Sequence, residues 1–184
     1  QSTLPWPSNV SSNSSSGTIA YAIANPTTFI ARNDSNRDWY YTGSESTDNT
    51  RWTTSESSKS IYDPCPAGWR VPDGGRRGVW SKVKGSSSDF SHTYNSSNEG
   101  MNFSGKFGSA STIWYPASGY RVDSDGRLSN VGGSGYYWSA SPYNSGAHSL
   151  GFKDDGYVFP SGKDTRSYGQ SVRCLQVIDE VAEP

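Results

Sequence analysis

The chain has 184 residues, a formal net charge of −1 and a hydrophobic fraction of 32%, while aromatic residues make up 14%. A disordered tail has high net charge and few aromatic residues, and a nucleic-acid-binding domain carries a basic surface, so both classes are excluded. No run approaches 18 apolar residues, so no membrane-spanning segment is predicted. One compact domain with an aromatic core and a neutral polar surface is expected.

The first third of the chain is polar. Residues 1–18 contain a Ser/Gly run that predicts a flexible or linker start. Residues 18–30 predict a strand or a short helix, interrupted at Asn25-Pro26. Residues 33–60 predict a long loop pinned by four aromatic side chains: Trp39, Tyr40, Tyr41 and Trp52. No signal peptide is visible and the chain begins at Gln1, so we expect a leader or a larger upstream region to have been removed.

The middle of the chain is rigid and then polar again. Three prolines in residues 63–72 exclude a helix there, because each fixes φ near −65°. Residues 78–83 predict a short helix, and residues 85–111 are rich in Ser, Gly and Asn.

The last third has strand composition. Strands are predicted at 114–120, 136–140, 149–152, 157–159 and 171–178, the last as the clearest buried strand. Asp125-Gly126 and Asp155-Gly156 predict hairpin turns. A small, twisted antiparallel sheet with long loops is the expected result.

The two cysteines, Cys65 and Cys174, fit no zinc motif, which needs close pairs. They are either two free buried thiols or one disulfide that closes most of the domain. A composition rich in Ser, Gly and Tyr is typical of exported proteins and favours the disulfide.

The sequence nominates no catalytic residue, no metal ligand and no cofactor. His92 and His148 lie in Ser/Gly/Asn-rich segments and are interpreted as exposed loop histidines. Asp123-x-Asp125-Gly126 and Asp154-Asp155-Gly156 resemble fragments of calcium loops, but hairpin turns explain both better. No pair of acids, phosphate loop or basic stripe is evident.

Residues 136–170 favour binding, because they are crowded with Tyr, Ser, Asn, Gly, His and Asp. Tyrosine gives a large contact area at low entropic cost, and Ser, Gly and Asn adapt their hydrogen bonds. The alternative is that Trp138, Phe152 and Phe159 form the core and the tyrosines only line strands, which also favour Tyr.

Four segments resemble the signature of the Fibrobacter-major-paralogous (FISUMP) type domain. They are Asp-Pro-Cys-Pro-Ala-Gly-Trp-Arg-Val-Pro at 63–72 followed by Trp80, Trp-Tyr-Pro-Ala-Ser-Gly-Tyr at 114–120, Gly-Tyr-Tyr-Trp-Ser at 135–139 and Tyr-Gly-Gln-Ser-Val-Arg-Cys at 168–174. The likeness covers residues 61–176. It implies a single α+β domain over 1–184 with a C-type-lectin-like fold, few short helices and long ordered loops.

The resemblance also implies residue roles and a location. It implies that Cys65 pairs with Cys174, and it places Trp69, Trp114, Trp138 and Val172 in the core. Its members belong to gut-bacterial surface lipoproteins and tips of fimbria-like pili, so an extracellular location on a bacterial surface is expected. Residues 139–167 are similar in composition to variable proteins of diversity-generating retroelements, which implies a hypervariable surface.

The chain departs from two relatives of that fold. The sugar-and-calcium motifs of calcium-dependent lectins are absent, since Glu183-Pro184 merely ends the chain. Formylglycine-generating enzymes use a redox-active cysteine pair, whereas both cysteines here are expected to form a structural bridge.

The function expected is a non-enzymatic adhesin that binds a protein or glycan on another cell, with pilus subunits as further partners. Its expected ligand-binding residues are Tyr137, Ser139, Ser141, Tyr143, Asn144, His148, Ser149, Lys153, Asp154, Tyr157, Arg166 and Tyr168. Arg166 is expected to be a charged anchor of the interface. An enzyme resembling the formylglycine-generating enzymes and a purely structural pilus domain remain the alternatives.

Overall fold

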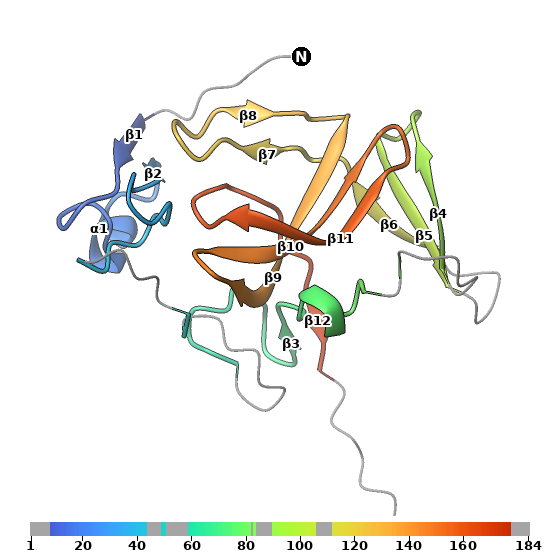
Figure 1. The fold of residues 1–184 in the computed structure, drawn as a ribbon, viewed down its shortest axis with the longest axis horizontal. Helices are drawn as coiled ribbons and strands as arrows, with labels where there is room; N and C mark the ends of the chain where they lie inside the picture. Colours follow the sequence, from blue (N-terminus) through green and yellow to red (C-terminus); the bar gives the residue numbers. More distant parts are fainter. Residues whose placement is uncertain are drawn as a thin grey trace, which may run out of the picture.

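The computed structural model describes residues 8–43, 49–50, 59–81, 83, 90–105 and 112–177. These residues form twelve strands, one α-helix and one 3-10 helix (Figure 1). The helical elements are short: α1 (Ile19–Ala24) and the 3-10 helix η1 (Gly75–Arg77). Neither is long or apolar enough to cross a membrane.

The expected α+β, C-type-lectin-like class is wrong, because the described part of the chain is nearly all β. A helix must fix a full turn before its hydrogen bonds accumulate, and Gly, Pro, Ser and Asn interrupt this chain too often for that. Even α1 is only six residues long, capped by Thr18, whose hydroxyl accepts a hydrogen bond from the Tyr21 amide, and it buries no residue.

The central sheet is antiparallel, in the order β11-β10-β9, and contains β9 (Ser134–Tyr143), β10 (Gly146–Lys153) and β11 (Val158–Thr165). Tight turns join the strands, with Asn144 and Gly156 in the left-handed region at φ +48° and +84°. Asp155-Gly156 therefore makes the hairpin turn predicted from the sequence. The predicted strands 136–140 and 149–152 fall in this sheet, and the predicted strand 157–159 overlaps the start of β11.

A second antiparallel sheet packs against the central one. It contains β4 (Phe90–Asn95), β5 (Gly100–Gly105) and β6 (Thr112–Pro116), on the side of the central sheet opposite the N-terminal strands (Figure 1). Aromatic rings join the two sheets edge to face: Phe103 to Phe152 at 6.2 Å and Tyr115 to Tyr137 at 4.9 Å between ring centroids. Leu150, Phe152 and Met101 are completely buried here, so this is the main core.

The N-terminal segment forms a separate small layer. Strands β1 (Ser8–Ser11) and β2 (Thr28–Ala31) pair in parallel, and α1 connects them. This layer docks on the hairpin of β7 (Tyr120–Arg121) and β8 (Leu128–Ser129). The Arg32 guanidinium lies 3.2 Å from the buried Asp123 carboxylate, and Phe29 lies against Gly126. Residues 8–11 are thus part of a sheet, while residues 1–7 and Trp52 lie outside the described residues.

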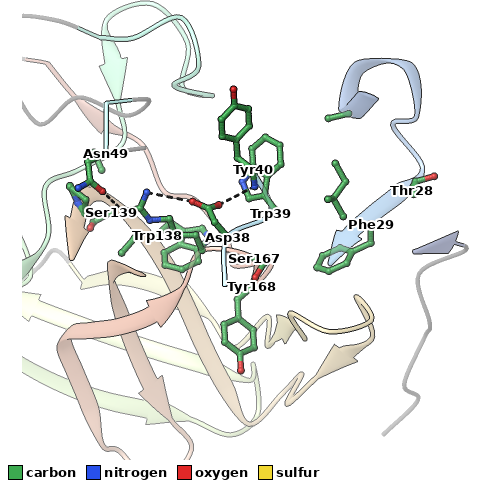
Figure 2. A pocket seen from close by; sticks show the side chains of 16 residues that line it. Thr28, Phe29, Asp38, Trp39, Tyr40, Asn49, Trp138, Ser139, Ser167 and Tyr168 are labelled. Carbon is green, nitrogen blue, oxygen red and sulfur yellow. Dashed lines mark hydrogen bonds and ion pairs between the residues drawn. The ribbon is translucent and has the colours of Figure 1, made fainter. Parts of the chain in front are cut away.

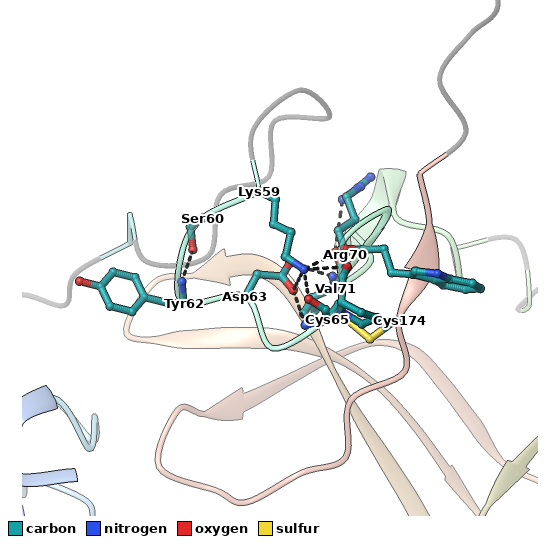
Figure 3. Close-up of polar contacts among 10 residues, drawn as sticks. Lys59, Ser60, Tyr62, Asp63, Cys65, Arg70, Val71 and Cys174 are labelled. Carbon is teal, nitrogen blue, oxygen red and sulfur yellow. Dashed lines mark hydrogen bonds and ion pairs between the residues drawn. A yellow bond between two sulfur atoms is a disulfide. The ribbon is translucent and has the colours of Figure 1, made fainter. Parts of the chain in front are cut away.

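Cys65 and Cys174 form a disulfide, as the resemblance implied. The bridge lies beside the two-stranded sheet of β3 (Trp69–Arg70) and β12 (Leu175–Gln176). The buried Asp63 carboxylate accepts hydrogen bonds from the amides of Cys65, at 2.8 Å, and Val71, at 2.9 Å (Figure 3). The Lys59 ammonium lies 3.7 Å from the same carboxylate and donates to the Cys65 carbonyl. This network fixes the rigid segment 63–72.

Several expectations for local structure are wrong. Residues 171–177 contain only the two-residue strand β12, which is exposed, instead of a long buried strand, and Ile178 lies outside the described residues. The described residues between Gly78 and Val83 form turns, because the helical turn η1 ends before them. Apolar content predicted burial of 171–178, but the strand there pairs only with the two-residue β3 and is exposed, whereas Trp80 and Val83 are buried without forming a helix.

The aromatic core is also only partly as expected. Trp138 and Trp80 are buried, whereas Trp69 is 40% exposed in its two-residue strand and Trp114 is half-buried. Val172 is half-buried against the disulfide cluster.

Candidate functional site

The twelve side chains predicted to bind a ligand do not form one continuous face. Three are buried, namely Tyr137, Ser139 and Ser149. Four are half-buried, namely Ser141, His148, Arg166 and Tyr168. Five are exposed, namely Tyr143, Asn144, Lys153, Asp154 and Tyr157. The four of these residues on β9 occupy alternate positions of one face, yet they change from buried through half-buried to exposed toward the end of the strand. Their burial therefore follows position along the sheet.

The three buried residues serve the fold. The Tyr137 hydroxyl donates to the Pro116 carbonyl at 2.7 Å, and burial raises the pKa of this phenol to about 12. The Ser139 hydroxyl donates to the His148 carbonyl at 2.7 Å. The Ser149 hydroxyl donates to the Asp164 carboxylate. The side chains of Tyr137 and Ser149 are enclosed by the domain, and their contact with a ligand stays a prediction.

The five exposed residues lie at the two ends of β10. Because β10 has eight residues, these ends are about 23 Å apart. At one end the Lys163 ammonium lies 4.0 Å from the centroid of the Tyr143 ring, and His148 packs on the same ring. At the other end Tyr157 packs on Phe159 at 4.4 Å between centroids. One small ligand therefore contacts only one of the two ends.

A pocket of about 440 Å³ lies between the N-terminal layer and the central sheet (Figure 2). This volume is typical of sites for small ligands. Strand β2 and the loop that follows it form one side of this open pocket, and β9, the start of β10 and the residues that follow β11 form the opposite side. The lining residues are mostly apolar or aromatic: Ala22, Thr28, Phe29, Ile30, Asp38, Trp39, Tyr40, Asn49, Trp138, Ser139, Ala140, Pro142, Ala147, Arg166, Ser167 and Tyr168.

Asp38 and Arg166 are the two charged residues of this lining, and they face each other. The Arg166 guanidinium lies 3.6 Å from the Asp38 carboxylate, and the two side chains are 12% and 5% exposed. Arg166 also donates to the carbonyl of Gly146 at 3.0 Å and to the side chain of Asn49. Asp38 also accepts a hydrogen bond from the Tyr40 amide at 3.2 Å. The pair adds no net charge to the pocket.

Five aromatic side chains line the same pocket: Phe29, Trp39, Tyr40, Trp138 and Tyr168. In Figure 2 the hydroxyl groups of Tyr40 and Tyr168 point to opposite sides, away from the Asp38 carboxylate. Burial raises the pKa of Tyr168, and the Asp123 carboxylate adds to the shift, so this phenol is neutral at physiological pH. The rings thus offer uncharged aromatic surface to an occupant.

The pocket brings together three of the residues predicted from sequence: Ser139, Arg166 and Tyr168. Pro142 and Ala147 also line it, so the turn that carries Tyr143 and Asn144 borders the same side. Phe29, Asp38, Trp39, Tyr40 and Trp138 also line the pocket, although their sequence context does not nominate them for binding. The run Trp39-Tyr40-Tyr41 in a polar segment is the available signal, but it equally fits a set of loop anchors.

The expectation that both histidines lie in exposed loops is wrong. His92 is in β4 and His148 is in β10, both half-buried. The Ser161 hydroxyl lies 3.4 Å from Nδ1 of His148, but Nδ1 is also 3.2 Å from the Gly162 carbonyl, which only accepts. When Nδ1 carries a proton, it donates to that carbonyl. Nδ1 then has no lone pair to accept the Ser161 proton as a general base.

Both acidic turn motifs form turns, as predicted. Asp123 pairs with Arg32, and Asp155 accepts a hydrogen bond from the Tyr157 amide at 2.8 Å. Among the residues that the structure describes, no three His, Cys, Asp or Glu side chains are close enough together to hold a metal ion.

Compared with known proteins, the chain matches no family model, no curated protein and no solved structure.

Proposed function

We propose that this chain is a non-enzymatic ligand-binding domain whose ligand occupies the pocket between β2 and β9. The observation that carries the proposal is the pocket itself: about 440 Å³, lined by five aromatic side chains and one internally neutralised ion pair. Ligand sites are typically concave and mostly apolar, with few polar groups. Aromatic side chains contribute large contact areas when a ligand covers them.

The accessibility of the aromatic walls supports binding. Phe29, Trp39 and Tyr40 are only half-buried, although the rings of the main core are buried. A ligand that covers them removes additional apolar surface from water, at roughly 25 cal/mol per Å². If these rings only stabilised the fold, burying them under the chain's own residues would increase the stability further.

A location outside the cytoplasm is part of the proposal. The Cys65–Cys174 disulfide supports it, because such bridges persist in oxidising compartments and are rare in the cytosol. The likeness of residues 61–176 to the FISUMP-type signature supports a bacterial surface protein that contacts a protein or glycan of another cell. The exposed Tyr143 and Asn144, beside the pocket, are the proposed extension of the contact surface and the proposed place for sequence variation.

A fragment library screened by saturation-transfer NMR tests this function. We expect a subset of fragments to bind the wild-type chain and to lose binding on Trp39→Ala, while Tyr157→Ala leaves it unchanged. Tyr157 is the matched control, because it is a half-exposed aromatic residue outside the pocket. If no fragment binds, or if Trp39→Ala folds and retains binding, the pocket is not the ligand site and a purely structural role is favoured.

A further inference from the structure

Four polar side chains of the pocket lining already form hydrogen bonds within the protein. The Ser139 hydroxyl donates to the His148 carbonyl, and the Ser167 hydroxyl donates to the Arg37 carbonyl at 2.9 Å. Asn49 accepts from Arg166, and the Thr28 hydroxyl lies 2.9 Å from that of Ser8. A ligand rich in hydroxyl groups needs several directed donors and acceptors, so these commitments disfavour a sugar ring.

The charges of the pocket are committed in the same way. Arg166 forms an ion pair with Asp38 and donates hydrogen bonds to the Asn49 side chain and to the carbonyls of Gly146 and Asn144. A charged ligand would give up its water shell, and each of the two charges it meets already has an opposite partner. Burial of a charge without a counter-charge is costly, so the pocket disfavours both cations and anions.

We infer that the pocket selects an uncharged aromatic ring that carries few hydroxyl groups. This inference rests on the proposed function and specifies its ligand class. Phe29, Trp39, Tyr40, Trp138 and Tyr168 supply the apolar and edge-to-face contacts that such a ring favours. The ring belongs either to a free small molecule or to an aromatic side chain of a partner protein.

Four probes of similar size test the selectivity, with affinity measured from NMR chemical-shift titrations: indole, tryptamine, indole-3-acetate and methyl β-glucopyranoside. The three indoles share one ring and differ in charge, and the glucoside is neutral but rich in hydroxyls. We expect indole to bind at least tenfold more tightly than each of the other three. The inference is overturned if tryptamine, indole-3-acetate or the glucoside binds as tightly as indole. The pocket would still be a ligand site in that case. Failure of all four probes together with the fragment library contradicts the proposed function itself.

Two variants locate the indole and test the charge argument. Ala147→Met adds volume to the β10 wall of the pocket, and we expect it to weaken indole binding at least fivefold without loss of folding. Asp38→Asn removes the negative member of the ion pair, and we expect it to improve indole-3-acetate binding at least fivefold relative to indole. Circular dichroism confirms that each variant folds. The inference is contradicted if folded Ala147→Met binds indole as tightly as the wild type. It is also contradicted if folded Asp38→Asn keeps the wild-type ratio of indole-3-acetate affinity to indole affinity.

A fifth probe distinguishes the two sources of the ring. Acetyl-Gly-Trp-Gly-amide carries the same indole on an uncharged backbone. Binding at least as tight as that of indole supports a protein side chain as the natural occupant, and weaker binding supports a free small molecule.

Discussion

The guanidinium of Arg166, just after β11, lies 3.6 Å from the carboxylate of Asp38, in the loop after β2. This ion pair connects the N-terminal layer to the central sheet and is part of the pocket lining. Ser167, next in the chain, supports the same junction through its hydrogen bond to the Arg37 carbonyl. The site therefore depends on correct docking of these two parts of the domain.

Arg166→Met should destabilise the fold by about 3 kcal/mol, because it leaves the Asp38 carboxylate buried without a counter-charge. Asp38→Asn should cost less, since Arg166 keeps the carbonyls of Gly146 and Asn144 as acceptors. The double variant Asp38→Asn/Arg166→Met should lose less stability than the sum of the losses in the two single variants. Urea denaturation of all four proteins measures the coupling, and strictly additive effects would show that the pair does not interact.

Asp63→Ala should destabilise the fold by about 2–4 kcal/mol. It removes the carboxylate that accepts from the Cys65 and Val71 amides and leaves two enclosed N–H groups without partners. Asp34→Ala is the control, because Asp34 is fully exposed and its 4.0 Å contact with Arg32 is a surface ion pair of little value. Chemical denaturation should show a clear loss for Asp63→Ala and almost none for Asp34→Ala; equal effects would contradict the role of Asp63.

Reduction of the Cys65–Cys174 bridge should lower Tm by roughly 10 °C or more. The closed loop spans 109 residues, and the chain-entropy model gives up to about 4.7 kcal/mol for a loop of this size. Calorimetry with and without reductant measures the effect. The double variant Cys65→Ser/Cys174→Ser should melt at the reduced Tm and be insensitive to reductant, whereas an unchanged wild-type transition under reductant would refute the prediction.

Stability should fall at alkaline pH through Tyr137. Burial raises its pKa from 10.0 to about 12 in the folded protein, so folding favours the neutral phenol. Its contribution is complete below pH 10 and is lost as pH rises from 10 through about 12, on the order of 2 kcal/mol in all. Urea denaturation between pH 8 and pH 12 measures this loss, and Tyr137→Phe, which does not ionise, should show a shallower decline. Parallel curves for the two proteins would exclude Tyr137 as the cause.

Gly135→Ala should destabilise the fold by at least about 2 kcal/mol. A Cβ atom at this position would lie 2.2 Å from the tip of the Phe152 ring, which is completely buried and has no room to move. Gly133→Ala is the matched control, since a Cβ there meets nothing closer than 3.8 Å. Thermal melts of the two variants should differ by several degrees, and similar Tm values would show that the core around Phe152 yields easily.

The sequence by itself determined the local features of this protein. Asp125-Gly126 and Asp155-Gly156 predicted turns that the structure contains, because only a few residues accept a left-handed backbone. The prolines of segment 63–72 excluded a helix, and strand composition located β9, β10 and the start of β11. The motif around Cys65 and Cys174 implied the disulfide. These features depend on backbone preference and on neighbours in the chain, which a sequence displays directly.

Only the tertiary structure decided which side chains form the core and which form the site. Trp69 and Trp138 are the same residue type in similar strand contexts, yet one is exposed and the other buried, because only Trp138 lies in the central sheet. Tyr137 is buried and Tyr143 is exposed although both occupy alternate positions of one face of β9, because burial falls toward the end of that strand. The pocket joins Phe29 and Trp39 to Arg166, so its chemistry exists only after the N-terminal layer docks on the sheet. Burial and contact are properties of packed surfaces, and no local pattern in the chain encodes which surfaces will meet.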